Sequence, residues 1–225
     1  NRAQISINFT NYKISPIHQV FDAVCDLASE RGLRVTGSEL VGLIPKSALI
    51  DAGKYYLKNQ GRSLGVSESD ILECAVQSLG LNDVSKFNSK EKIIEFAIED
   101  TNDSLLHLST DDLIHSISQN SPAPGGGSVS ALAGALGAAL LSMVSLLTYD
   151  KKEFLSRRTK MSRLGEMAHK YQKRLKELVD EDTHAFDSVM DASRLPEKSK
   201  SEIKFKKQEL FKELMNATRE KIRKV

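Results

Sequence analysis

The spacing of hydrophobic positions differs between the two halves of the chain. In the first half, Asn1–Phe9 alternates polar and apolar residues, which predicts a β-strand. Leu33–Leu43 predicts a second strand, interrupted by glycines. Apolar residues spaced three and four apart predict helices at residues 16–31, 46–59, 68–79 and 90–97. This order predicts a small α/β subdomain with an incomplete sheet over residues 1–98.

The polar, acidic stretch Glu99–Ser104 separates this region from a second one. Every later periodic segment is helical: 109–118, 128–147, 153–192 and 198–225. We therefore predict an α+β fold class, with a linker over residues 99–108 and an all-α domain over residues 109–225. The chain begins at Asn1 and stops at Val225 within a charged helical pattern, so we expect a fragment whose second domain is truncated at its C-terminus.

The central stretch Ser121–Leu147 joins two prolines and three glycines to a long uncharged segment. Glycine lets the backbone approach a ligand closely, and Ser128 is a good N-cap for the helix that follows. Helix N-termini present unpaired N–H groups to anionic or carbonyl-bearing ligands. Gly125, Gly126, Gly127 and Ser128 are therefore candidate binding residues. The alternative is a structural glycine loop before a buried helix, because the stretch matches no nucleotide-binding fingerprint.

Small residues also recur within this segment. Ser130, Gly134, Ala138 and Ser142 lie four residues apart, which predicts a ridge where another helix comes close. Val129–Leu147 is nearly long enough to span a bilayer. Because Ala, Gly and Ser dominate it and charged amphipathic helices follow, we expect no membrane insertion.

The last long pattern contains the best candidate for chemistry. Its apolar stripe runs through Leu164, Met167, Tyr171, Leu175 and Leu178, and resumes at Ala185 or Phe186. Asp182 occupies the intervening position, where an ionised carboxylate is rarely buried unless it is paired or used. It is either half of an ion pair with a neighbouring helix or a partly desolvated carboxyl that passes protons near neutral pH.

Metal and nucleic-acid sites receive little support. The spacing of Asp180, His184 and Asp187 could hold a metal, but a solvated helix face explains it better, so we expect no metal. A net charge of +2 over 225 residues does not argue for nucleic acid. Cys25 and Cys74 lie in apolar helical patterns, which favours free thiols and a reducing, cytoplasmic compartment.

Four stretches, in order, resemble the formimidoyltransferase-cyclodeaminase family. They are TGSELVGLIPKSALIDAGKYYL (Thr36–Leu57), QSLGLNDVSKFNSKEKIIEF (Gln77–Phe96), SPAPGGGSVSALAGALGAAL (Ser121–Leu140) and LVDEDTHAF (Leu178–Phe186). The resemblance implies that residues 1–98 are the C-terminal subdomain of a formiminotransferase and residues 109–225 the N-terminal part of a helical cyclodeaminase domain. It also implies that Asp182, the second acidic position of the LVDxD motif, is the catalytic aspartate.

The same resemblance implies two reactions of histidine breakdown that use tetrahydrofolate, in polyglutamylated form, as co-substrate. One transfers the formimino group of N-formiminoglutamate to tetrahydrofolate. The other cyclises 5-formiminotetrahydrofolate to 5,10-methenyltetrahydrofolate and releases ammonia. The transferase histidine of the family belongs to a part absent from this chain, so we expect no formimino transfer by the chain alone.

The resemblance further implies a homo-oligomer of dimers arranged in a ring, in the cytoplasm, with peripheral Golgi or cytoskeletal association. Two alternatives stay open. One is a stand-alone enzyme similar to methenyltetrahydrofolate cyclohydrolase, which hydrolyses rather than deaminates. The other is a non-catalytic helical module whose ridge of small residues serves oligomerisation.

Overall fold

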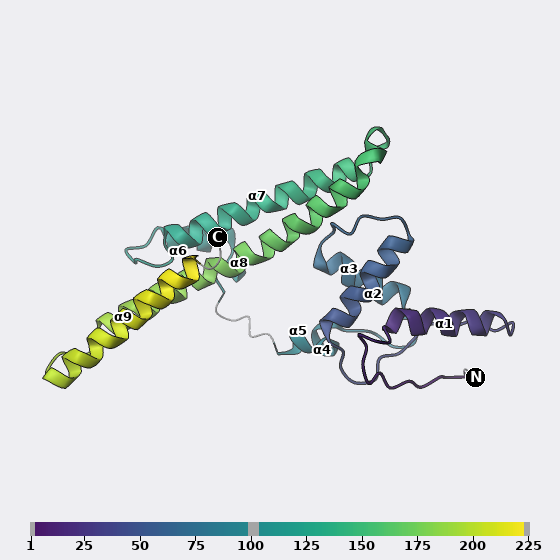
Figure 1. Cartoon of the computed structure of the whole chain (residues 1–225), viewed down its shortest axis with the longest axis horizontal. Helices are drawn as coiled ribbons and strands as arrows, with labels where there is room; N and C mark the ends of the chain where they lie inside the picture. Colours follow the sequence, from purple (N-terminus) through teal and green to yellow (C-terminus); the bar gives the residue numbers. More distant parts are fainter. Residues whose placement is uncertain (1–2, 99–103, 223–225) are drawn as a thin grey trace. The chain divides into compact units, whose positions relative to one another are not determined.

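The computed structural model describes residues 3–98 and 104–222, and in these ranges all regular structure is helical (Figure 1). Residues 3–98 contain α1 (Ile17–Ser29), α2 (Lys46–Asn59), α3 (Glu68–Ser78), α4 (Ser89–Lys92) and α5 (Ile94–Ala97). The remaining elements are η1 (Leu105–His107), α6 (Thr110–Ile117), α7 (Gly126–Tyr149), η2 (Lys152–Arg157), α8 (Arg158–Ser193) and α9 (Lys200–Ile222).

The chain forms two compact units. One comprises residues 1–100 and 142–167, and the other comprises residues 101–141 and 168–225. The first half of the predicted linker, residues 99–103, lies outside the described residues, whereas η1 lies in its second half.

The predicted sheet is wrong, because the described residues contain no strand. In the described part of Asn1–Phe9, residues 3–9, Ile5 is 68% exposed, and in Leu33–Leu43, Val41 is 85% exposed. An alternation of polar and apolar residues indicates which residues of a strand would share a face. A strand also needs a neighbouring segment whose backbone pairs with its N–H and C=O groups. The described chain supplies one isolated parallel bridge, between Ile44 and Ile93, and the fold class is all-α rather than α+β.

The helix predictions agree better with the structure. The predicted helix over residues 46–59 has the same bounds as α2, and α3 begins at the predicted Glu68 behind a capping box of Ser67 and Asp70. The predicted helix over residues 90–97 is instead two short helices. Ile93 separates them with an extended backbone, and it is the fully buried residue that bridges to Ile44.

The core of the first unit lies between α2 and α3. Leu49 and Ile93 are fully buried in it, together with apolar residues of both helices. Gly53 sets the spacing of the two helices, because a Cβ atom there would overlap the backbone oxygen of Ile71. The α2 backbone at Gly53 therefore lies directly against Ile71 of α3.

A polar cluster joins α1 to α2. His18 is 6% exposed and stacks on Tyr55, with 4.3 Å between ring centroids. The hydroxyls of Tyr55 and Tyr56 donate to the two carboxylate oxygens of Asp22, at 2.8 and 2.9 Å. The buried His18 Nδ1 has no hydrogen-bond partner among the described residues. The packing therefore favours a neutral imidazole at this position.

Acidification is expected to destabilise this packing. Burial lowers the pKa of His18 below its ordinary value, and the nearby Asp22 and Asp51 oppose that shift. Because the unfolded chain then takes up the proton at a higher pH than the folded one, the contribution of neutral His18 is complete above about pH 6.5 and decreases as the pH falls toward the lowered value. Thermal unfolding of the first unit at about pH 7.5 and about pH 5.5 measures this loss.

The variant His18→Phe keeps the ring stack and removes the titrating group. We expect its melting temperature to fall less between the two pH values than that of the wild type. The exposed His115 is the control position, and His115→Phe should keep the wild-type dependence on pH. Equal dependence in His18→Phe and the wild type would contradict the assignment.

Within the first unit, the loop after α2 also contacts the end of a helical hairpin formed by α7, η2 and α8. The Leu64 N–H donates to Ser162 Oγ at 3.0 Å. A Cβ atom built on Gly65 would lie 2.7 Å from the Cα atom of Gly165, and one built on Gly165 would lie 2.8 Å from the Cα atom of Gly65. Neither glycine has room for a side chain, so the loop and α8 meet backbone to backbone.

The residues of α7 that are buried are small. Ser128, Ala131 and Ala135 are buried in the second unit, and Ser142 and Ser145 in the first. The predicted ridge is wrong at Ser130, which is exposed, and its hydroxyl donates to the Gly126 carbonyl. Gly134, also predicted on the ridge, lies against the Leu175 side chain of α8.

The large side chains of α7 are exposed instead. They include Leu136, Leu140, Met143, Val144 and Leu147, each between 49% and 60% exposed. By length and composition α7 could cross a membrane, and 17% of its most apolar window is buried. The sequence-based expectation that this helix is not inserted in a membrane stays a prediction.

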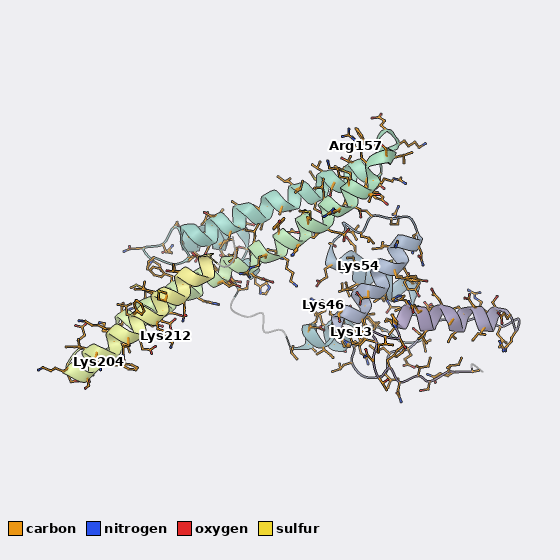
Figure 2. All side chains as sticks on the ribbon, viewed as in Figure 1. Lys13, Lys46, Lys54, Arg157, Lys204 and Lys212 are labelled. Carbon is orange, nitrogen blue, oxygen red and sulfur yellow. The ribbon has the colours of Figure 1, made fainter. Side chains whose placement is uncertain are left out.

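The lysine-rich α9 has its charges partly paired. Figure 2 shows Lys204 and Lys212 extending from this helix. Lys212 Nζ lies 3.1 Å from a carboxylate oxygen of Glu209, and Lys206 Nζ lies 2.6 Å from one of Glu197. Apolar side chains alternate with these charges, as in an amphipathic helix.

Candidate active site

Helix α7 begins at Gly126, two residues earlier than predicted. Ser128 therefore lies in the first turn rather than at the N-cap, and that prediction is wrong. None of Gly125, Gly126 and Gly127 has a positive φ. Glycine is therefore needed at position 127 because it has no side chain, not because of its backbone conformation.

Asp182 of α8 lies directly against this first turn. The Ser128 N–H donates to Asp182 Oδ2 at 3.1 Å. A Cβ atom on Gly127 would overlap both carboxylate oxygens of Asp182. The carboxylate thus occupies the space beside Gly127 and satisfies one of the N–H groups that an α-helix leaves unpaired at its start. The structure brings together the predicted Asp182, Gly127 and Ser128, with Asp182 partly buried.

The hydroxyl of Ser128 binds the same turn of α7 to α8. Ser128 is 3% exposed, and its Oγ donates to the Val179 carbonyl at 2.8 Å and lies 3.1 Å from Thr183 Oγ1. Val179, Asp182 and Thr183 are spaced three and four residues apart, so they share one face of α8. Neither Val179 nor Thr183 was predicted from the sequence, although the three-residue spacing of Val179 from Asp182 was a usable signal.

The contact stripe of α8 differs from the predicted one. Met167 and Tyr171 are 42% and 56% exposed, so their predicted burial is wrong. The buried residues are Gly165, Ala168, Val179 and Ala192. Steps of three and four residues lead from Gly165 through Ala168 to Val179 and Asp182, so these residues share one face of α8. The small residues on this face allow α7 to approach closely. Asp182 therefore lies on the packed face of α8, next to small neighbours rather than large apolar ones.

The two acidic residues before Asp182 have other partners. Asp180 accepts hydrogen bonds from Ser104 Oγ at 2.7 Å and from the Leu105 N–H at 2.8 Å. Glu181 accepts two from the Arg174 guanidinium, at 2.7 and 2.8 Å, which raises the pKa of Arg174. Each carboxylate of the motif DED thus contacts a different part of the structure, and only that of Asp182 lies at the glycine loop.

The three residues whose spacing could hold a metal, Asp180, His184 and Asp187, do not form a metal site. Asp180 is bound to Ser104 and Leu105, while His184 and Asp187 are exposed. In residues 3–98 and 104–222 no group of three His, Cys, Asp or Glu side chains is arranged to hold a metal. Cys25 and Cys74 are free and partly exposed.

Chemically, the arrangement is a carboxylate held in place by a backbone N–H beside a glycine. Such a carboxylate can accept a proton from one atom of a bound molecule and return it to another. The absence of a side chain at Gly127 leaves the carboxylate room to lie against the backbone. The catalytic role of Asp182 and the binding role of Gly125–Ser128 stay predictions.

Comparison with known proteins gives the chain its relatives. The family model described as Formiminotransferase-cyclodeaminase matches residues 109–222, and the one described as Formiminotransferase domain matches residues 1–99. The chain is similar to formimidoyltransferase-cyclodeaminase of Sus scrofa, with 37% identity over 87% of the chain and 36% of the relative. It is also similar to that of Gallus gallus, with 36% identity over 90% of the chain and 38% of the relative.

A methenyltetrahydrofolate cyclohydrolase of Methylorubrum extorquens is 33% identical over 45% of the chain and 49% of its own length. The chain spans little more than a third of the length of the Sus scrofa and Gallus gallus relatives. One family model matches each half of the chain, and the two matches together cover nearly all of the chain. The chain belongs to the formimidoyltransferase-cyclodeaminase family.

Proposed function

We propose that the protein, at its full length, cyclises 5-formiminotetrahydrofolate to 5,10-methenyltetrahydrofolate and ammonia, with Asp182 as the group that moves the proton. Residues 1–99 would belong to the part that transfers the formimino group of N-formiminoglutamate to tetrahydrofolate. The observation that carries the proposal is the contact of Asp182 with Gly127 and Ser128, in a segment that the family model matches.

The reaction requires one proton to move between two nitrogen atoms. N10 of the folate attacks the carbon of the protonated formimino group, which forms the N10–C bond and leaves an amino group on that carbon. Asp182 takes the proton from N10 and gives it to the amino nitrogen. The C–N bond then breaks with its electron pair on nitrogen, ammonia leaves, and the methenyl cation keeps the positive charge.

A carboxylate that the backbone holds in place would serve as base and then as acid. The Ser128 N–H binds one carboxylate oxygen of Asp182, and the packed first turn of α7 fixes that N–H. A general base and acid contributes only when it is held within hydrogen-bond reach of both atoms it serves. Gly125–Gly127 and the start of α7 would hold the pterin or the glutamyl tail through backbone N–H groups.

The test is ammonia release by the full-length protein with the substitution Asp182→Asn. The amide oxygen can still accept from the Ser128 N–H, so the turn should keep its structure while proton transfer is lost. We expect kcat to fall by about 100-fold or more, with substrate binding retained. Asp187→Asn is the matched control, because it makes the same change at an exposed position of α8 and should keep kcat. Wild-type turnover in Asp182→Asn would refute the role of Asp182.

A second candidate function is hydrolysis of 5,10-methenyltetrahydrofolate. The similarity to a methenyltetrahydrofolate cyclohydrolase over 102 residues favours it. Both reactions act at the same one-carbon bridge between N5 and N10, so one site can serve either. Purified protein that hydrolyses the methenyl compound but releases no ammonia from the formimino compound would support this second function.

We also propose that the protein is a homo-oligomer. The exposed large side chains of α7 are a hydrophobic surface of a kind that partners commonly cover, and a ring of dimers is the arrangement expected for the family. Light scattering on the full-length protein gives the subunit number, and a monomer at micromolar concentration would contradict the proposal.

A further inference from the structure

Residues 104–128 form one continuous segment that binds α8 at both ends, and we call it the strap. It comprises η1, α6, the proline- and glycine-containing loop and the first turn of α7. At its start, Ser104 Oγ and the Leu105 N–H donate to the two oxygens of Asp180, at 2.7 and 2.8 Å. At its end, the Ser128 N–H donates to Asp182 Oδ2.

The two anchors are close in sequence but point in different directions. Asp180 and Asp182 are two positions apart in a continuous helix, so their side chains project about 160° apart around its axis. The strap therefore has to pass around α8 between its two ends. Its loop, residues 118–125, lies in the chain between the contact of Ser104 and Leu105 with Asp180 and the contact of Ser128 with Asp182.

We propose that Asp180 is a positioning residue for the proposed cyclodeamination: it anchors the start of the strap and so sets where the glycine loop lies relative to the Asp182 carboxylate. This inference rests on the proposed function. One side chain here accepts two hydrogen bonds, from a backbone N–H and from a hydroxyl, and so fixes both residues at the start of the strap.

Releasing this anchor removes the two hydrogen bonds that hold the start of the strap on α8. The loop then samples more positions, and the fraction of time in which substrate and the Asp182 carboxylate are aligned decreases. Because displacements of about 1 Å can cost about 100-fold in rate, a modest loosening is measurable in kcat. Binding should change less than kcat, because Asp180 lies outside the contacts around Gly127 and Ser128.

The experiment compares Asp180→Ala, Asp180→Asn and the control Asp187→Asn in the full-length protein, with ammonia release from 5-formiminotetrahydrofolate as the assay. Asp180→Ala removes both acceptors, and kcat should fall by about 10- to 100-fold with KM nearly unchanged. Asparagine still accepts from the Leu105 N–H and can donate to Ser104 Oγ, so Asp180→Asn should recover most of the activity. Asp187→Asn should match the wild type.

Two kinetic results would overturn the inference. If Asp180→Asn is as inactive as Asp180→Ala, the charge itself is needed and the role is not positioning. If Asp180→Ala lowers the melting temperature but keeps kcat at a temperature where it is folded, the contact only stabilises the fold. Recovery in Asp180→Asn, together with a loss in folded Asp180→Ala, supports the proposal.

Hydrogen exchange supplies a readout that does not depend on activity. Peptides covering residues 104–128 should exchange faster in Asp180→Ala than in the wild type and in Asp187→Asn, and unchanged exchange would overturn the anchoring. The two proposals fail differently. A wild-type protein that releases no ammonia refutes the proposed function, and with it the positioning role. An active wild type with an equally active Asp180→Ala refutes the positioning role alone.

Discussion

Replacing Gly127 with alanine is expected to lower kcat for cyclodeamination by about 100-fold or more. A Cβ atom at this position would overlap both carboxylate oxygens of Asp182, so the side chain of Asp182 has to leave its place. The Ser128 N–H would then lose the acceptor that it now has at 3.1 Å. Ammonia release and substrate binding, measured separately, should show a loss in turnover that exceeds the loss in affinity.

Gly137 of the same helix provides the matched control for this prediction. It makes the same Gly→Ala change farther along α7, outside the glycine loop, where a Cβ atom would have nothing within 4 Å. Because alanine also favours a helix over glycine, Gly137→Ala should keep both activity and stability. Equal activity in the Gly137→Ala and Gly127→Ala proteins would show that Asp182 does not need its place beside Gly127.

Replacing Gly53 with alanine is expected to destabilise the first unit by about 1–3 kcal/mol or more. Helix propensity alone predicts the opposite sign, a gain of up to about 1 kcal/mol. The steric overlap outweighs the gain in helix propensity, because the added Cβ atom would overlap the backbone oxygen of Ile71 and lie 2.7 Å from Ile71 Cγ2. A backbone oxygen inside a helix cannot rotate away, so α2 and α3 have to separate and open the core around Leu49.

Gly137 of α7 is the control for the propensity term. A Cβ atom there would have nothing within 4 Å, so Gly137→Ala should leave stability unchanged or raise it by up to about 1 kcal/mol. Hydrogen exchange over α2 and α3 at increasing urea concentration measures the effect on the first unit. A Gly53→Ala protein as resistant to urea as the wild type would contradict the close packing.

Several helices could be predicted because their information is local. The bounds of α2 follow from Pro45, the apolar period and the polar residues after it, and the start of α3 follows from the capping box at Ser67. The predicted strands failed because their alternation was read correctly but pairing is not local. Ile93 shows the same limit, since its burial and its bridge to Ile44 divide one predicted helix into two.

The candidate site was predictable in part. A carboxylate in a helical stripe singled out Asp182, and the glycine run singled out Gly127, each from the sequence around it. The residues that make up the stripe were misjudged, because the structure buries Gly165 and Ala168 and exposes Met167 and Tyr171. Close helix contact selects small residues, and a reading based on large apolar side chains does not detect it.

By itself, the sequence determined most of the helices, the acidic and glycine motifs, and the family, because each depends on residues that are near in the chain. Only the tertiary structure decided that Asp182 lies beside Gly127, that Asp180 binds Ser104, and that Gly65 meets Gly165. The physical reason is that these contacts join positions far apart in sequence. Their specificity comes from the shape left by missing side chains and from single hydrogen bonds, neither of which leaves a periodic pattern along the chain.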